Sequence, residues 1–86
     1  MKELEKIYKA LGNRRRLAII KFLENQREAS VSEITKYLKL SFRSTSKHLA
    51  VLRQLDIVDK EQRSLLVIYS LSQPTHPIVK QFLTLV

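Results

Sequence analysis

Apolar residues recur along the chain at spacings that predict five helices and one β-hairpin. Residues 57–71 instead hold β-branched and apolar side chains on both sides of a short polar segment, which predicts two strands and a tip. The order is therefore α-α-α-α-β-β-α, and residues 1–86 form a single domain that is mainly α with a small β-hairpin. The segments with helical spacing are residues 1–11, 14–25, 31–38, 42–54 and 75–86.

The segment from Ser30 to Leu55 predicts two short helices joined by a tight turn. Ser30 and Glu33 form an S-x-x-E capping box, so the first of these helices begins near Val31. Leu40 is followed by Ser41, which can cap the next helix, and this leaves a connection of only two or three residues. Helices joined by so short a turn cross steeply, and we interpret the pair as a helix-turn-helix.

The second helix of this pair has an apolar side and a cationic side. A rotation of about 100° per residue separates the two sides. The apolar side carries Thr45, His48, Leu49, Leu52 and Leu55. The opposite side carries Arg43, Ser46, Lys47, Ala50 and Gln54. Lysine and arginine occur here without any acid from Ile34 to Leu55, which favours a recognition helix that enters DNA. A solvated basic face on an ordinary packed helix is the alternative.

The hairpin that follows is typical of a wing beside a recognition helix. Its strands are residues 57–60 and 65–71, with a polar tip at residues 61–64. Lys60 and Arg63 lie near the tip and could reach a flanking phosphate or the minor groove. The second strand is apolar on both faces, so one face is covered by a neighbouring element or is exposed for binding another protein.

The helix at residues 14–25 is apolar over more than half of its circumference, which predicts a central place in the core. Gly12 ends the preceding helix and Asn13 can cap this one, while residues 25–29 form a polar link. The arginines at residues 14–16 oppose the helix dipole. They either contact phosphates or are simply solvated.

The residues from Leu40 to Arg53, LSFRSTSKHLAVLR, resemble the recognition-helix signature of the ArsR/SmtB family of winged-helix repressors. The Ser-Lys-His-Leu-x-x-Leu core is the most specific part of that signature. The segment LGNRRRL is similar to the family's usual Leu-x-Asp-Pro-Thr-Arg-Leu, with Arg16 and Leu17 in register. The resemblance extends from Leu4 to Leu71.

This resemblance implies a winged helix-turn-helix that dimerises through its terminal helices, and it offers packing and pairing as a further role for Arg16. The family's wings usually carry glycine where Ser64 stands, and its recognition helices often carry glutamine at the position of Phe42. A phenyl ring cannot hydrogen-bond adenine and would instead favour a thymine methyl group. Arg43 can bridge O6 and N7 of guanine. Alternatively, Phe42 packs back over Thr45 and Leu49, and Arg43 only holds phosphate.

Composition agrees with a nucleic-acid partner. A formal net charge of +8 and a pI near 10.1 favour polyanions, with nucleic acid first and an anionic membrane surface second. A chain of this size gains stability from a second subunit. No apolar run approaches the roughly 18 residues of a membrane span, and the N-terminus lacks the apolar core of a signal peptide. We therefore expect a soluble cytoplasmic protein without a membrane partner.

The expected function is sequence-specific binding of double-stranded DNA by a homodimeric transcriptional repressor whose operator is an imperfect inverted repeat. The alternative is a winged-helix module for protein interaction or non-specific nucleic-acid binding. Helix 42–54 would enter the major groove and wing 57–71 would lie on flanking backbone. The expected DNA-binding residues are Ser41, Phe42, Arg43, Ser44, Ser46, Lys47, Lys60 and Arg63. The expected dimer residues, on helices 1–11 and 75–86, are Leu4, Ile7, Tyr8, Leu11, Ile78, Phe82 and Leu85.

Enzymatic activity, a cofactor and a metal site are not expected. Acids are few and scattered, and no glycine-rich phosphate loop exists. Ser44 and His48 lie one helical turn apart, where they are more simply a surface serine and a packed histidine. Metal sensors of the resembling family use cysteines or sets of Asp, His and Glu on the last helix. This chain has no cysteine, and His76 has no ligand neighbour on its acid-free last helix.

Overall fold

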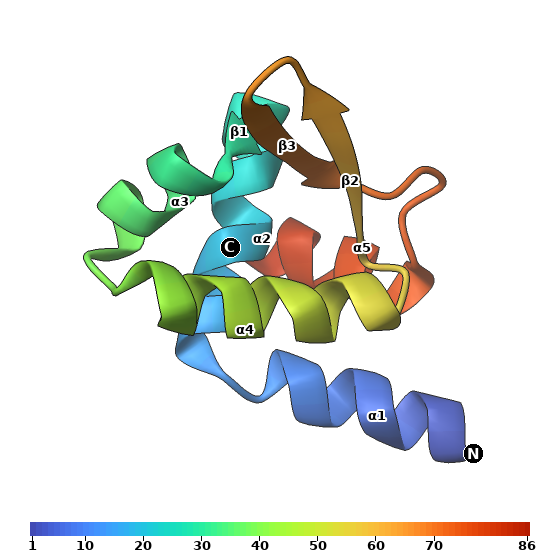
Figure 1. The fold of residues 1–86 in the computed structure, drawn as a ribbon. Coiled ribbons are helices and arrows are strands. Elements are labelled where there is room, and N and C mark those ends of the chain that lie inside the picture. The colour runs from blue at the N-terminus through green and yellow to red at the C-terminus, as the bar shows by residue number, and fades with distance from the viewer.

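The computed structural model describes residues 1–86 as five helices and a three-stranded sheet (Figure 1). The predicted order of helices and wing strands is confirmed, with one additional short strand between the second and third helices. None of the helices is both long and apolar enough to cross a membrane. The elements are α1 (Lys2–Leu11), α2 (Arg14–Gln26), β1 (Glu28–Ser30), α3 (Val31–Leu38), α4 (Phe42–Gln54), β2 (Val58–Arg63), β3 (Leu66–Leu71) and α5 (Pro77–Leu85).

The helices begin and end where the sequence supplies caps. The backbone N–H of Gly12 donates to the carbonyl of Tyr8 and ends α1. Oδ1 of Asn13 accepts from the amides of the second and third residues of α2, at 3.0 and 3.1 Å. The predicted capping box is confirmed at α3, because Ser30 Oγ accepts from the Glu33 amide at 3.1 Å and Glu33 Oε1 accepts from the Ser30 amide at 2.8 Å.

The sheet has the strand order β1-β3-β2 and is antiparallel throughout. The interpretation of residues 25–29 as a polar link is wrong from Glu28 onward, because Glu28, Ala29 and Ser30 form β1 and pair with β3. Ala29 and Ser30 are buried there although the segment is polar in sequence. This strand pairs with the second edge of β3, so β3 is the central strand of the sheet.

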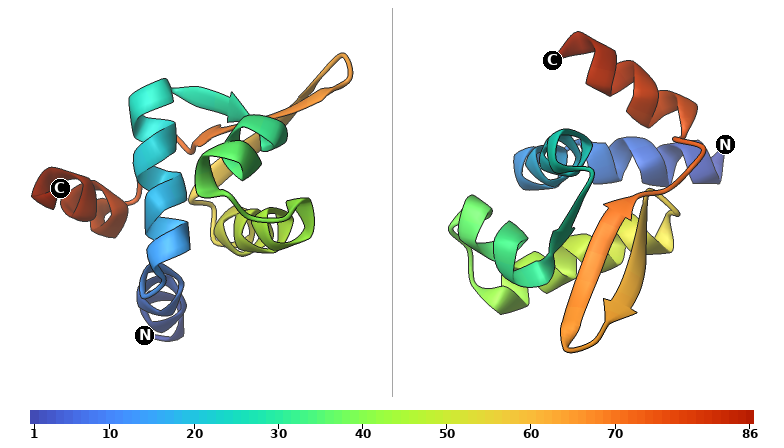
Figure 2. Two further views of the ribbon diagram at one scale, coloured as in Figure 1. Left: turned by 90° about the vertical axis from the view of Figure 1, so that its left-hand side faces the viewer. Right: turned by 90° about the horizontal axis from the view of Figure 1, so that it is seen from above.

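The first wing strand, β2, extends further than the hydrophobic pattern predicts, whereas β3 begins one residue later than predicted. Gln62 pairs with Val67 and Arg63 pairs with Leu66, so the predicted polar tip at residues 61–64 belongs mostly to β2. The turn consists only of residues 64 and 65. The hairpin extends beyond the helices (Figure 2), and its ladder of backbone hydrogen bonds needs no apolar side chains where both faces meet water. This is why the apolar pattern stops before the strand does.

The core is built around α2, as predicted. Ile19 and Ile20 are completely buried, and Leu23 is 1% exposed. Figure 2 shows α2 between α5 on one side and the sheet and α4 on the other. Burying a side chain of this size contributes about 1.5–3 kcal/mol. The buried residues that pack with α2 include Ile34, Leu49, Leu52, Val58, Tyr69 and Val79.

Candidate nucleic-acid interface

Helix α4 is held in one rotational setting by its buried side. Thr45, Leu49 and Leu52 are 0% exposed, and the Thr45 hydroxyl donates to the carbonyl of Ser41 at 3.0 Å. The cationic side predicted from the sequence faces solvent: Arg43, Lys47, Ala50 and Gln54 are exposed, and Ser46 is half-buried. The predicted division of the helix into two sides is confirmed.

The N-terminus of α4 presents polar and aromatic groups without an acid. Ser41 Oγ caps the helix by accepting from the amide of Ser44 at 3.0 Å. Phe42 is 63% exposed. Arg43 is also exposed. The positive end of the helix dipole and an adjacent guanidinium together make this terminus attractive to an anion.

The turn between α3 and α4 adds further positive charge. Lys39 ends α3 in the left-handed conformation, with φ 56° and ψ 41°. This conformation turns the chain within three residues and leaves Lys36 and Lys39 exposed beside the start of α4.

The three arginines that begin α2 have different environments. Arg16 is half-buried, and its Nε donates to the carbonyl of Ala10 at 2.7 Å. Its Nη2 lies 3.5 Å from the carbonyl oxygen of Lys9, and its Nη1 lies 3.4 Å from Nδ1 of His48. Arg14 and Arg15 are exposed. Arg16 therefore joins α1, α2 and α4, whereas its two neighbours remain open to solvent.

His48 sits on the margin between the buried and cationic sides of α4. Partial burial lowers its pKa from the ordinary value, and the positive charges of Arg16 and Arg15 lower it further. The neutral imidazole is therefore favoured. In this state a ring nitrogen without a proton can accept from Arg16.

The two wing cations lie on opposite faces of the sheet. Lys60 pairs with Tyr69, while Arg63 pairs with Leu66. Side chains alternate between faces along a strand, so Lys60 shares the face of the buried residues Val58 and Tyr69, and Arg63 lies on the other face. Val58 and Tyr69 belong to the same core as Leu49 of α4. Of the two cations, Lys60 thus lies on the face toward α4.

Arg63 is paired with two carboxylates. Its Nη1 donates to Glu28 Oε2, and its Nη2 donates to Glu28 Oε1 at 3.0 Å and to Glu61 Oε1 at 2.9 Å. The hydrogen bond from Arg63 holds the pKa of Glu28 below its ordinary value, and the two carboxylates raise the pKa of Arg63. No local pattern in the sequence indicates that Glu28 belongs to the site. Only the strand register of β1 against β3 brings it near the wing.

The chain from residue 13 to residue 60 matches the family model of bacterial regulatory proteins of the arsR family. This match covers more than half of the chain and includes α2, α3, α4 and the start of β2. The protein belongs to the ArsR family. The resemblance to this family that the sequence showed is confirmed.

Individual ArsR-family relatives agree with this assignment. The transcriptional activator HlyU of Vibrio cholerae is 39% identical over 66 residues, which are 77% of this chain and 60% of HlyU. The aligned chain thus spans less than two thirds of that curated relative. The solved structure of reduced HlyU from V. cholerae is 34% identical, with a TM-score of 0.83 over 98% of this chain and 84% of that one. These relatives are regulators rather than enzymes.

Two more distant structures share the fold. The transcriptional repressor PagR of Bacillus anthracis is 24% identical, with a TM-score of 0.79 over 98% of this chain and 92% of PagR. A homodimeric winged helix-turn-helix DNA-binding domain from Mycobacterium bovis, described as a possible ArsR-family regulator, is also 24% identical. Its TM-score is 0.81 over 98% of this chain and 74% of that one. The predicted winged-helix fold class is confirmed by these comparisons.

The terminal helices of this ArsR-family chain expose part of their apolar surface. Leu4, Tyr8 and Leu85 are 40%, 58% and 78% exposed. Ile7 is buried, whereas Leu11, Ile78 and Phe82 are half-buried. Leu11 and Phe82 pack against the core of the same chain. Of the predicted dimer residues, Leu4, Tyr8 and Leu85 are therefore exposed, whereas Leu11 and Phe82 pack within the subunit.

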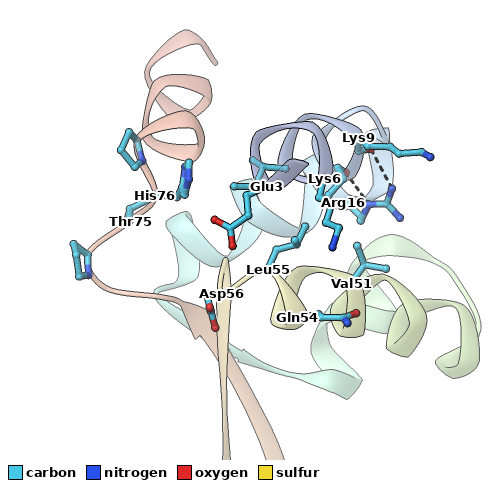
Figure 3. A pocket seen from close by; sticks show the side chains of 14 residues that line it. Glu3, Lys6, Lys9, Arg16, Val51, Gln54, Leu55, Asp56, Thr75 and His76 are labelled. Carbon is cyan, nitrogen blue, oxygen red and sulfur yellow. Dashed lines mark hydrogen bonds between the residues drawn. The ribbon is translucent and has the colours of Figure 1, made fainter. Parts of the chain in front are cut away.

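Helix α5 begins at Pro77 rather than at residue 75. His76 precedes it as the N-cap, and its Nδ1 accepts from the amide of Ile78 at 3.1 Å. A cavity of about 850 Å³ lies among α1, the end of α4 and the segment before α5 (Figure 3). Arg16, Glu3 and Asp56 line it with charge. Nowhere do three or more His, Cys, Asp or Glu side chains group in a way that could hold a metal ion.

Proposed function

We propose that this ArsR-family protein binds double-stranded DNA in a sequence-specific manner as a homodimeric transcriptional regulator in the cytoplasm. Helix α4 (Phe42–Gln54) would enter the major groove, and the wing at residues 57–71 would lie on the flanking backbone. The observation that carries this proposal is the two-sided burial of α4. One side is completely buried, and the exposed side is cationic and free of acids.

The proposed DNA contacts divide into base contacts and phosphate contacts. Phe42 and Arg43 occupy the first turn of α4, the part of a recognition helix that contributes most base contacts. Arg43 would bridge guanine, and Phe42 would contact a thymine methyl group. Their exposure supports these roles. The residues proposed to position the protein on phosphates or nearby bases are Ser41, Ser44, Ser46, Lys47, Lys60 and Arg63.

For Arg63, phosphate binding requires an exchange of partners, because Glu28 and Glu61 hold its guanidinium in the free protein. Exposed ion pairs are weak, so a phosphate can replace them at modest cost. Lys60 needs no such exchange. Arg14 and Arg15 are free to add phosphate contacts, whereas Arg16 is engaged within the fold.

We propose dimerisation through the terminal segments, residues 1–11 and 75–86. The exposed side chains of Leu4, Tyr8 and Leu85 support this assignment, and the similar domain from M. bovis is described as homodimeric. A two-fold axis would set two α4 helices about 34 Å apart in successive major grooves, so the operator would be an imperfect inverted repeat.

We propose repression as the regulatory outcome, through occupation of an operator that overlaps a promoter. Relatives carry both names, since HlyU is called an activator and PagR a repressor. A reporter gene with the selected operator placed inside or upstream of its promoter distinguishes the two. Repression predicts lower expression in the first arrangement and no increase in the second.

Selection of bound fragments from random duplex DNA tests the proposed function directly. We expect an enriched inverted repeat with half-sites one helical turn apart. With about six to ten phosphate contacts per dimer, affinity should fall by about 10³ to 10⁵ between roughly 50 and 200 mM salt. A flat salt response, or fragments without a shared motif, would instead indicate a protein-interaction module or non-specific binding.

A further inference from the structure

The tip of the wing presents a leucine to solvent. Leu65 is 94% exposed in the two-residue turn that joins β2 and β3. The polar side chains just before the turn are engaged, because Gln62 Nε2 donates to the carbonyl of Ser64 at 3.1 Å and Arg63 is paired with Glu28. The foremost large side chain of the wing is therefore apolar rather than cationic.

A single exposed leucine on a protein surface is ordinary. The position of Leu65 is informative because the distance from the core to the turn matches a distance in DNA. Val58 begins β2 and is 1% exposed in the core beside α4. The five residues from there to Arg63 extend about 17 Å at about 3.3 Å per residue. Half of one helical turn of B-DNA, which separates a major groove from the next minor groove, is also about 17 Å.

The direction of the hairpin, like its length, would allow the tip to reach DNA that is bound by α4. In the left view of Figure 2, the hairpin tip and α4 lie on the side of the molecule away from α5. Helix α5 belongs to the proposed dimer interface, so the tip points away from the second subunit. Arg63 lies just behind the tip on one face of the hairpin, and Lys60 lies on the other face three residues further back. Each would face one of the two phosphate backbones that border a minor groove.

We propose that Leu65 is a specificity-determining residue that enters the minor groove beside the half-site. This inference rests on the proposed function. The minor-groove floor carries an additional amino group, guanine N2, wherever a G·C pair is present. A leucine side chain cannot hydrogen-bond that group and would lie against it. The wing would therefore favour A·T pairs, and apolar side chains at such positions can also open a base step.

Inosine provides the test, because an I·C pair keeps the major-groove pattern of G·C and lacks the minor-groove amino group. The selected operator is prepared with A·T, G·C or I·C pairs at the positions flanking each half-site. We expect the native protein to bind the A·T and I·C duplexes about ten-fold more tightly than the G·C duplex, consistent with partial burial of one leucine. Leu65→Ala should weaken binding to the first two duplexes and remove the discrimination.

Leu66→Ala is the matched control, since it makes the same change in the next residue. Leu66 is 53% exposed and lies on the face of Arg63 rather than at the turn. We expect this variant to keep the discrimination. Thermal unfolding, monitored by circular dichroism, tests whether both variants are folded.

Native-like discrimination by Leu65→Ala, or equal binding of the native protein to all three duplexes, would overturn the inference and leave the proposed function intact. Unchanged DNA binding together with an altered oligomeric state of Leu65→Ala would instead identify a contact between copies and also overturn it. A native protein that binds no duplex in a salt-dependent manner would refute the proposed function itself.

Discussion

Arg16 and His48 connect the start of α2 to α4, with Nη1 of Arg16 3.4 Å from Nδ1 of His48. The same guanidinium donates to the carbonyl of Ala10 at the end of α1. One side chain thereby links a helix of the proposed dimer interface with the helix proposed to contact DNA.

Arg16→Ala should lower the free energy of unfolding by about 1–3 kcal/mol, because it leaves partly buried carbonyl groups without a donor. Arg16→Lys should recover only part of this loss, since an ammonium group cannot reproduce the fork of a guanidinium. Urea unfolding measures both. Arg14→Ala is the matched control and should change stability by less than about 0.5 kcal/mol, because Arg14 is exposed. Equal effects at both positions would contradict the linking role.

His48 should make stability depend on pH just below neutrality. Its folded pKa lies below the ordinary value of 6.5, so between these two values the unfolded chain binds more protons than the folded one. The stabilisation that the neutral His48 provides is complete above the ordinary pKa. It is lost as the pH falls toward and below the folded pKa. Urea unfolding from about pH 7.5 to about pH 5.5 should therefore show a steeper loss for the native protein than for His48→Gln. Parallel curves would contradict this.

Leu85→Asp should dissociate the proposed dimer without unfolding the subunit. Leu85 is 78% exposed on α5, so a carboxylate there has access to water in the monomer and would lose it in the interface. Sedimentation velocity at micromolar concentration should show a dimer for the native protein and a monomer for the variant. Thr84→Asp, at a neighbouring exposed polar position, controls for the added charge. A native monomer, or a dimeric Leu85→Asp variant, would refute the assignment.

Glu28→Gln should release Arg63 for phosphate binding. The variant loses one of the two carboxylates that hold the guanidinium in the free protein, so only Glu61 remains. We expect tighter DNA binding, because Arg63 no longer has to leave Glu28 to reach a phosphate, and a logarithmic salt slope close to that of the native protein. The double variant Glu28→Gln with Arg63→Gln should lose this increase. An unchanged affinity in Glu28→Gln would show that Arg63 only fastens the wing.

The sequence predicted those parts of the fold that depend on local signals. The capping box at Ser30 and Glu33, the cap at Asn13 and the two-sided pattern of α4 all act within a few residues, and all are confirmed. The strand β1 was missed because three residues are too few to show an alternating pattern. The end of β2 was missed because Glu61, Gln62 and Arg63 are polar on both faces.

The parts of the site that escaped prediction depend on residues far apart in the chain. Glu28 and Arg63 are 35 residues apart, and only the register of β1, β3 and β2 brings their side chains together. The contact between Arg16 and His48 likewise spans 32 residues. The sequence left the roles of the arginines at residues 14–16 open. The structure separates these roles, because the guanidinium of Arg16 contacts α1 and α4 whereas Arg14 and Arg15 are exposed.

The most direct test of the account is the effect of Arg43→Ala across a set of operators that carry every single base-pair substitution in one half-site. If α4 reads bases through its first turn, the variant should lose about 1–3 kcal/mol on the preferred site and become indifferent to the base pair at one position, which should be a guanine beside a thymine-rich step. Sensitivity at all other positions should remain. An equal loss on every sequence would show that Arg43 only holds phosphate, and it would contradict the assignment of base recognition to this residue.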